Sequence, residues 1–273
     1  MTAPVRASSS WLAVREAADA RSRATDLVRD VADLLSPAAD PVLVHDLGCG
    51  SGSMGRWLAP LLARPQHWVL HDRDADLLAE AAGRRDGGQV GAPITVQISH
   101  GDITDLSADD LSGAGLITAS ALLDMLTAGE LERLADVCAA AGCPILITLS
   151  VIGRVELMPG DALDTAIQDA FNAHQRRDPG RGPLLGPDAV DAAAEAFGGR
   201  GCAVTVRPSH WQLGAADASL MVQWLGGWVG AADEQDPRLG AEAEPYLLRR
   251  RAMALNGGLR LTVHHQDLLA VPR

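Results

Sequence analysis

The chain has 273 residues, and its 35 acidic and 23 basic residues give a formal net charge of −12. Every basic residue other than histidine is an arginine, which excludes a lysine Schiff base and the phosphate-binding lysine of a P-loop. The acidic balance argues against a nucleic-acid partner and against an anionic membrane surface, because both need clustered cations.

Four cysteines are present, without CxxC spacing: Cys49, Cys138, Cys143 and Cys202. We interpret them as reduced thiols of a cytoplasmic protein. The first ten residues lack the apolar core of a signal peptide, and no apolar stretch is long enough to span a bilayer.

The chain begins with a predicted helix that runs from the N-cap hydroxyls of 8–10 to about Leu35, where Ser36–Pro37 should end it. Arg15, Asp19 and Arg23 follow one another at intervals of four residues on this helix. Two interpretations are open. The three side chains form a solvated ladder of ion pairs, or Arg15 reaches the carboxylate of a ligand.

Strands and helices alternate over residues 42–150. The predicted strands are Val42–His45, His67–His71, Ile94–Ile98, Leu116–Ala119 and Pro144–Ser150, and the helices are Met54–Leu62, Asp74–Ala82 and Ala128–Ala141. A glycine-rich loop is expected at 87–91. This rhythm predicts βαβ units and a parallel sheet covered on both faces, within one α/β domain.

The regular alternation of strands and helices ends after residue 150. We expect an insertion over 153–186 that contains a helix, Asp161–Arg176. The elements expected after it are a helix Pro187–Phe197, a strand Ala203–Val206, a helix Ala216–Ala231, a helix from about Pro245, and a last strand Leu259–His264.

A glycine turn follows the first strand. Residues 50–55 match the GxGxxG fingerprint of dinucleotide-binding proteins, and Asp72 lies twenty residues after Gly52, where a ribose-binding acid belongs. Asp46 argues against a dinucleotide, because a carboxylate about 4 Å from a pyrophosphate would be repelled by roughly 4 kcal/mol at an effective dielectric near 20. The same carboxylate would attract a ligand that carries an ammonium and a sulfonium.

The stretch Asp46-Leu47-Gly48-Cys49-Gly50-Ser51-Gly52 resembles the first motif of the class I, Rossmann-like S-adenosylmethionine-dependent methyltransferases. The resemblance implies S-adenosylmethionine as cofactor and S-adenosylhomocysteine as product. It also implies a doubly wound, mostly parallel seven-stranded α/β sheet of order 3-2-1-4-5-7-6. The last strand would be antiparallel and would lie between the fifth and sixth, with helices at the N-terminus and a helical insertion after the fifth strand.

Acids after three successive strands fit the same family. By resemblance, Asp72 holds the ribose hydroxyls, Asp102 accepts from the adenine amino group, and Ser120 lines the methionine end of the cofactor. The predicted cofactor-binding residues are Asp46, Gly48, Cys49, Gly50, Asp72, Arg73, Asp102, Ile103, Ser120 and Arg15. Taken alone, Asp72 or Asp102 is equally typical of a helix N-cap, a position that Asp74 also suits.

We therefore expect a single methyltransferase domain over 1–273. Its parts would be an N-terminal helical cap (1–41), a cofactor-binding half (42–150), an insertion and substrate region (151–200), and C-terminal strands and helices (201–273). The expected reaction is methyl transfer to a small-molecule acceptor. The alternatives are a non-catalytic homologue that binds the cofactor as a scaffold, and an NAD-dependent oxidoreductase. The oligomeric state and the acceptor atom are not predicted.

Two residues are candidate proton acceptors, because a general base is needed where the acceptor must lose a proton. Asp124 follows the fourth strand, where a cap for the next helix is an equal interpretation. His174 shares a helical face with Leu163, Ile167 and Ala170, so a core position is the alternative to a catalytic one.

Two further patterns receive a structural interpretation. Trp211, Trp224 and Trp228 are more typical of a core than of an aromatic binding surface. His264 and His265 are adjacent in a strand and should point to opposite faces, so we predict no metal site from them and Asp267.

Overall fold

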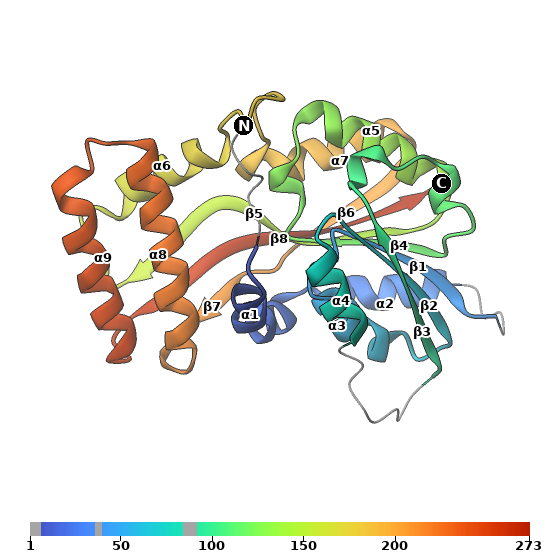
Figure 1. Ribbon diagram of the computed structural model, residues 1–273, viewed down its shortest axis with the longest axis horizontal. Helices are drawn as coiled ribbons and strands as arrows, with labels where there is room; N and C mark the ends of the chain where they lie inside the picture. Colours follow the sequence, from blue (N-terminus) through green and yellow to red (C-terminus); the bar gives the residue numbers. More distant parts are fainter. Residues whose placement is uncertain (1–6, 36–39, 84–91) are drawn as a thin grey trace.

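A computed structural model describes residues 7–35, 40–83 and 92–273. Figure 1 shows a long mixed sheet with helices on both of its faces. The helix end predicted at Ser36–Pro37 and the loop predicted at 87–91 lie outside the described residues.

The sheet has the order β3-β2-β1-β4-β5-β8-β6, and β7 pairs with β8 beyond this path. The strands are β1 (Val42–Leu47), β2 (Gln66–Asp72), β3 (Ile94–His100), β4 (Leu116–Ser120), β5 (Ile145–Met158), β6 (Cys202–Pro208), β7 (Trp211–Leu213) and β8 (Arg260–Pro272). The first five are parallel, and β8 is antiparallel to β5, β6 and β7. The predicted order is confirmed, with β8 as the last strand between the fifth and sixth. The short strand β7 was not predicted.

The helices are α1 (Ser9–Ser22), α2 (Thr25–Leu34), α3 (Ser53–Leu62), α4 (Ala75–Gly83), α5 (Ala128–Ala140), α6 (Asp164–Gln175), α7 (Ala189–Gly199), α8 (Ala218–Gln235) and α9 (Gly240–Leu255). One hydrophobic cluster joins α5 and α7 to one face of the sheet. A second joins α2, α3 and α4 to the other face. The doubly wound arrangement therefore buries the central strands on both sides, as their near-continuous apolar sequences require.

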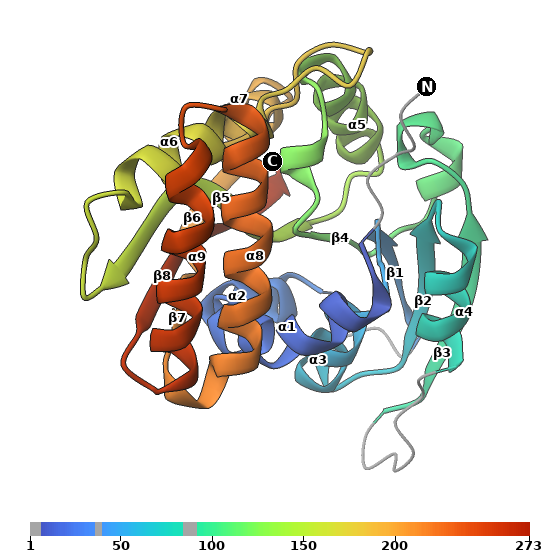
Figure 2. The same ribbon diagram turned by 60° about the vertical axis from the view of Figure 1, so that its left-hand side comes forward.

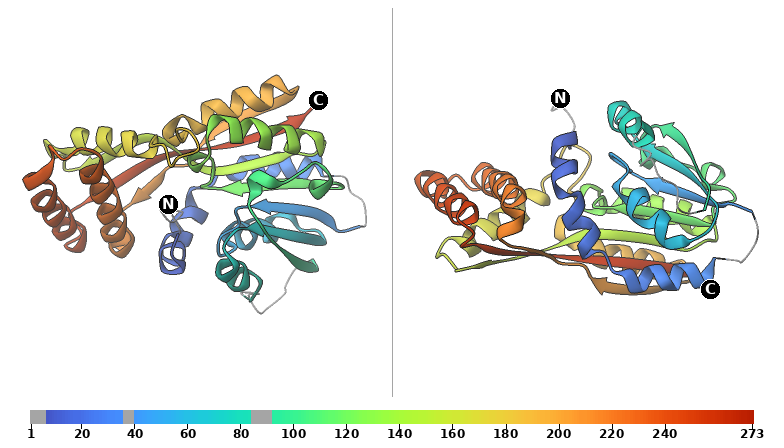
Figure 3. Two further views of the ribbon diagram at one scale, coloured as in Figure 1. Left: turned by 45° about the horizontal axis from the view of Figure 1, so that its top comes forward. Right: turned by 90° about the horizontal axis from the view of Figure 1, so that it is seen from below.

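A third hydrophobic cluster lies beyond the parallel sheet and joins α6, α8 and α9 to β7 and to the distal parts of β5 and β8. Figure 3 shows how β5 and β8 continue from the parallel sheet to carry these helices. Helix α1 contacts α3 on one side and both β7 and α8 on the other. Figure 2 shows it between the two groups of helices.

Two predicted strands end eight residues too early, at Ser150 and at His264. The fifth strand continues eight residues past Ser150, and the last strand starts at Arg260 and continues to Pro272. Val155 and Leu157 alternate with polar residues and pair with Val263 and Leu261 of β8. This alternation is typical of a sheet with one buried face, whereas the sequence interpretation ended the strand before Gly153.

The first predicted helix is in fact two helices. Arg23 ends α1 with an extended backbone (φ −59°, ψ 139°). The N–H of Ala24 then donates to Asp267 Oδ2 at 2.8 Å instead of continuing the helical ladder. The break turns the Arg23 side chain inward.

Candidate functional site

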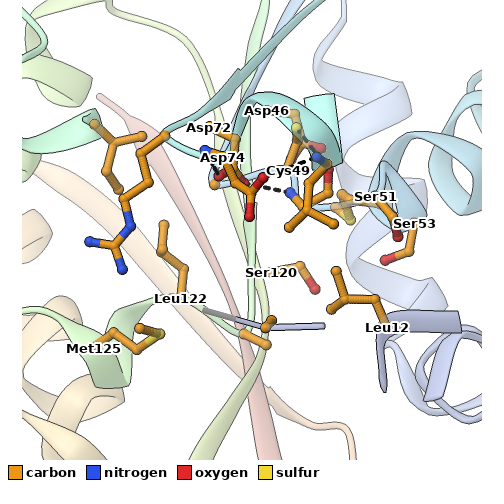
Figure 4. Close-up of a pocket in the computed structure, with 18 of the residues that line it drawn as sticks. Leu12, Asp46, Cys49, Ser51, Ser53, Asp72, Asp74, Ser120, Leu122 and Met125 are labelled. Carbon is orange, nitrogen blue, oxygen red and sulfur yellow. Dashed lines mark hydrogen bonds between the residues drawn. The ribbon is translucent and has the colours of Figure 1, made fainter. Parts of the chain in front are cut away.

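A cavity of about 730 Å³ lies at the carboxyl ends of the parallel strands, and all ten predicted cofactor-binding residues line it. They come from the β1–α3 turn, the ends of β2 and β4, the loop after β3, and α1. Figure 4 shows several of them around the cavity, with Leu12 of α1 facing Leu122 and Met125 from the opposite side.

The glycine turn between β1 and α3 needs glycine for two reasons. Gly48, Gly50 and Gly52 have φ of +65°, +53° and +84°, a region that other residues enter only with strain. A Cβ at Gly48 would also lie 2.9 Å from Leu122 Cδ1, and one at Gly50 would lie 3.2 Å from Leu12 Cδ1. The turn therefore brings backbone close to Leu122 on one side of the cavity and to Leu12 on the other.

Asp72 is fixed across this turn. Its Oδ2 accepts the Gly50 N–H at 2.8 Å and its Oδ1 accepts the Asp74 N–H at 2.9 Å, and these bonds are drawn in Figure 4. Asp74 caps α4 by accepting from the N–H groups of Asp76 and Leu77. Asp72 is therefore not the cap of this helix, and its carboxylate is held at the edge of the cavity.

Asp46 is almost fully buried, at 1% exposure. Its Oδ1 accepts from the Thr118 hydroxyl at 2.8 Å, while its Oδ2 has no partner among the described residues. Burial raises the pKa of Asp46 to about 7, against the opposing effects of the Thr118 hydrogen bond and the Arg23 charge. A buried carboxylate with one unmatched oxygen favours a ligand that brings a positive charge and an N–H donor.

Asp102 is half-buried and does cap a short 3₁₀ turn, Ile103–Asp105. Its Oδ1 accepts from the N–H and the hydroxyl of Thr104, at 3.0 and 2.8 Å. Burial raises the pKa of Asp102, but these hydrogen bonds and the Arg73 charge outweigh it and hold the pKa below its usual range. The capping interpretation therefore holds for Asp102, which also lines the cavity.

The interpretation of Arg15, Asp19 and Arg23 as a solvated ladder is wrong, because Asp19 and Arg23 are 4% and 3% exposed. Arg15 Nε does donate to Asp19 Oδ2 at 2.9 Å, as the spacing suggested. Asp19 also accepts from Trp211 Nε1 at 3.0 Å. This network fixes Arg15 at the wall of the cavity.

Arg23 lines neither cavity but holds residues of the first one in place, a role that the sequence interpretation missed. Its Nη2 donates to the hydroxyls of Ser120 and Ser53 at 3.1 and 3.3 Å, and its Nε to that of Thr148 at 3.3 Å. Its guanidinium also stacks on Trp57, 5.1 Å from the ring centre. The spacing from Arg15 was the only sequence signal, and it does not distinguish an inward from an outward side chain.

A second cavity of about 440 Å³ adjoins the first, and Trp11, Arg15 and Ala121 line both. Asp124 lines the second cavity, and burial raises the pKa of its carboxyl. Asp124 is not the cap of α5, because Thr127 and Glu130 form a capping box there.

His174 lines neither cavity, so the structure does not bring the two candidate proton acceptors together. By contrast, His264 and His265 both line the second cavity, as do Trp211, Trp224 and Trp228. Their rings nevertheless have different neighbours, as expected for adjacent residues of a strand: His264 contacts His210 and Glu156, and His265 contacts Trp211. Strand β5 is irregular between Val151 and Val155, where it pairs with this part of β8.

Within residues 7–35, 40–83 and 92–273, no group of three histidine, cysteine, aspartate or glutamate side chains is placed to hold a metal ion. In the same part of the chain, no helix combines the length and the apolar character that crossing a membrane requires.

No family model matches the sequence, and no curated protein matches it. Among solved structures, the chain is similar to mycolic acid cyclopropane synthase CmaA1 in complex with S-adenosylhomocysteine and CTAB. The identity is 12%, with 90% of this chain and 83% of that one covered, and the TM-score is 0.50. It is also similar to an S-adenosylmethionine-dependent methyltransferase from Geobacter sulfurreducens in complex with S-adenosylhomocysteine. Here the identity is 17%, the coverage 97% and 98%, and the TM-score 0.44.

The topology and the first of these similarities establish the fold. The chain has the Rossmann-like fold of class I S-adenosylmethionine-dependent methyltransferases, extended by β7 and by the layer of α6, α8 and α9.

Proposed function

We propose that the protein transfers the methyl group of S-adenosylmethionine to a small-molecule acceptor, with the cofactor in the larger cavity. One observation carries the proposal: the glycine turn and the three strand-end acids Asp46, Asp72 and Asp102 line one cavity. These acids are 26 and 30 residues apart in the sequence, and each lies at or just after the end of a different strand.

The cavity fits this cofactor by the chemistry of its donors and acceptors. The unpartnered Oδ2 of Asp46 would accept from the ammonium of the methionine part. The oriented carboxylate of Asp72 would accept from the ribose hydroxyls, and Asp102 Oδ2, which makes no hydrogen bond in the described part of the chain, would accept from the adenine amino group. Arg15 would hold the methionine carboxylate.

When bound, the cofactor supplies an electrophilic methyl group whose leaving group is a neutral thioether. No residue is needed to protonate that leaving group. The protein therefore contributes orientation and exclusion of water, and orientation alone is worth up to about 7–11 kcal/mol. Asp124, in the adjoining cavity, would take a proton from an acceptor that has to lose one. His174 remains a prediction that neither cavity supports.

The position of Asp46 argues against a dinucleotide as the ligand. A pyrophosphate at the glycine turn would face a carboxylate that is 1% exposed and whose Oδ2 lacks a hydrogen-bond partner among the described residues. The scaffold alternative differs in turnover, because a scaffold would bind the cofactor and transfer no methyl group.

Calorimetric titration with S-adenosylmethionine, S-adenosylhomocysteine and NAD tests the proposal. We expect micromolar binding of the first two and none of NAD. Asp72→Ala should weaken the binding of S-adenosylmethionine at least about tenfold, because it removes charge-assisted hydrogen bonds worth roughly 1.5–3 kcal/mol each. Binding of NAD alone would refute the proposal, and cofactor binding without turnover on any acceptor would favour the scaffold.

A further inference from the structure

The second cavity has an unusual share of the aromatic residues of this chain. The sequence contains only six tryptophans, two phenylalanines and one tyrosine. Five of these nine residues line the 440 Å³ cavity: Trp11, Phe171, Trp211, Trp224 and Trp228. A chain so poor in aromatic residues that places most of them around one cavity presents a surface suited to flat, conjugated molecules.

The rings come from four elements of the fold. Trp224 and Trp228 of α8 stack with ring centres 5.0 Å apart at an interplanar angle of 22°. Trp11 of α1 meets Trp211 of β7 edge to face, with centres 6.4 Å apart. Phe171 belongs to α6. The views in Figures 1 and 2 place α1 beside α8, which it contacts, and residues of both helices line the cavity.

A molecule in this cavity would reach the cofactor cavity directly. Ala121 lines both cavities and immediately follows Ser120, which lines the first. Trp11 and Arg15 complete the shared boundary. The boundary therefore lies beside the end of the cofactor cavity where Ser120 would line the methionine part.

The residues that line the second cavity carry two guanidinium groups against one carboxyl group, so the wall itself has no excess of negative charge. Arg15 and Arg154 line it, and each forms an ion pair, with Asp19 and Glu156 respectively. Asp124 is the single carboxylate among its lining residues. His264 and His265 add no positive charge near neutral pH, because burial lowers the pKa of both, that of His265 to about 3.

Unpartnered polar groups also belong to this cavity wall. Trp228 is 1% exposed, and its Nε1 has no hydrogen-bond partner among the described residues. Gln175 Oε1 and Asn172 Oδ1 are likewise buried without one, although Asn172 Nδ2 donates to the Gly153 carbonyl. A ligand with both a donor and an acceptor, as a hydroxyl group has, suits such a wall.

We propose that the second cavity is the acceptor site and that it binds a planar aromatic molecule without positive charge, which is methylated on a ring hydroxyl. This proposal rests on the proposed function. In the transfer, the bond between the hydroxyl oxygen and the methyl carbon forms as the bond between that carbon and the sulfonium sulfur breaks. The electron pair of the broken bond stays on sulfur, and the hydroxyl proton passes to the Asp124 carboxylate.

A matched set of two-ring compounds tests the proposal by calorimetry in the presence of S-adenosylhomocysteine. The planar hydroxylated members are 2-naphthol, 7-hydroxycoumarin and 8-hydroxyquinoline. The comparison members are decahydro-2-naphthol, which is not planar, and trimethyl(2-naphthyl)ammonium, which is cationic. We expect at least one planar member to bind with a dissociation constant below about 1 mM and at least about tenfold more tightly than either comparison member.

Equal or tighter binding of the saturated or cationic compound overturns the proposal, and so does the absence of binding by all three planar members. Binding of S-adenosylmethionine is measured first. If S-adenosylmethionine does not bind, the proposed function is refuted. If it binds but the planar compounds are not preferred over the comparison compounds, only the proposed acceptor class is refuted.

Variants then locate the ligand. Trp224→Leu changes a half-buried residue and should weaken the best planar ligand about tenfold while leaving the affinity for S-adenosylmethionine unchanged. Asp124→Asn should leave the binding of both ligands within about twofold and lower the rate of methyl transfer at least about tenfold. The control is Asp233→Asn, on the exposed side of α8. If Trp224→Leu and the control give the same affinity, the ligand does not occupy this cavity.

Discussion

The guanidinium of Arg15 lies 5.0 Å from the centre of the Trp211 ring, on the boundary that the two cavities share. The same guanidinium is 5.7 Å from the Trp11 ring and is held through Nε by Asp19. Neither Nη atom of Arg15 has a hydrogen-bond partner in the described part of the chain. A fixed, planar cation between two indoles is therefore placed to contact ligands on both sides.

Arg15→Gln should weaken S-adenosylmethionine binding about tenfold, because a charge-assisted hydrogen bond to the methionine carboxylate is worth roughly 1.5–3 kcal/mol. Arg15→Lys keeps the charge but loses the stacked plane, so it should restore only part of the affinity. Calorimetry measures both. Arg21→Gln, on the same helix but with an exposed side chain that pairs with Asp217, is the control and should bind like the wild type. Equal affinities for all four proteins would remove Arg15 from the site.

Asp46→Asn should change the stability of the fold and the affinity for S-adenosylmethionine in opposite directions. The pKa of Asp46 is about 7 in the folded protein, above its ordinary value of 3.8, so folding takes up a proton between these values. The stability that this proton contributes is complete below pH 3.8 and is lost as the pH rises through about 7. At about pH 8 the wild type buries an ionised carboxylate that the amide variant lacks, while the asparagine oxygen still accepts from Thr118.

The apo variant should therefore melt at a higher temperature than the wild type at about pH 8, and the difference should shrink towards about pH 4. Its affinity for S-adenosylmethionine should nevertheless fall at least about tenfold, because the ammonium loses its counter-charge. Thermal melts and calorimetry over this pH range check both effects. A variant that melts lower than the wild type at about pH 8, with no difference at about pH 4, would show that the ionised Asp46 stabilises the fold.

The acids of the site were predictable from the sequence, and the second cavity was not. Asp46 and Asp72 lie at the ends of strands with consecutive apolar residues, and Asp102 follows the alternating strand Ile94–His100. Parallel topology then brings the carboxyl ends of these strands to one edge. The second cavity combines Trp11, Phe171 and Trp224 with residues of β7 and β8, which no local pattern connects. Buried aromatic residues at helical spacing look alike whether they fill a core or line a cavity.

The orientation of side chains around the α1–α2 break could not be predicted from the sequence either. Arg23 turns inward because Ala24 bonds to Asp267, a residue 243 positions away. Strand β7 was missed for a related reason: its three residues are too few to show a strand pattern, and they form a strand only by pairing with Leu261–Val263 of β8, far away in the sequence.

Gly48→Ala tests the close approach at the glycine turn. The substitution combines a left-handed φ, worth roughly 1–2 kcal/mol of strain, with a Cβ 2.9 Å from Leu122 Cδ1. It should lower stability and also weaken S-adenosylmethionine binding, because Leu122 lines the cofactor cavity and has to move. Gly142→Ala is the matched control, since Gly142 has φ +67° and open space around its Cβ position. We expect it to lose a similar amount of stability with an unchanged dissociation constant, and a parallel loss of affinity in both variants would contradict the steric explanation.

Arg23→Met should shift the pH dependence of cofactor binding rather than simply abolish it. The positive charge of Arg23 lowers the pKa of Asp46, so its removal should raise that pKa further and move the rise of S-adenosylmethionine affinity with pH to a higher pH. At about pH 7 the affinity should fall roughly three- to tenfold, and part of the loss should be recovered at about pH 9, because Asp46 then ionises. Arg29→Met, which changes an exposed arginine of α2, should keep the wild-type profile. Calorimetry over about pH 6–9 makes the comparison. An unshifted profile with a uniform loss of affinity would mean that Arg23 acts by holding Ser120 and Ser53 in place and not through its charge.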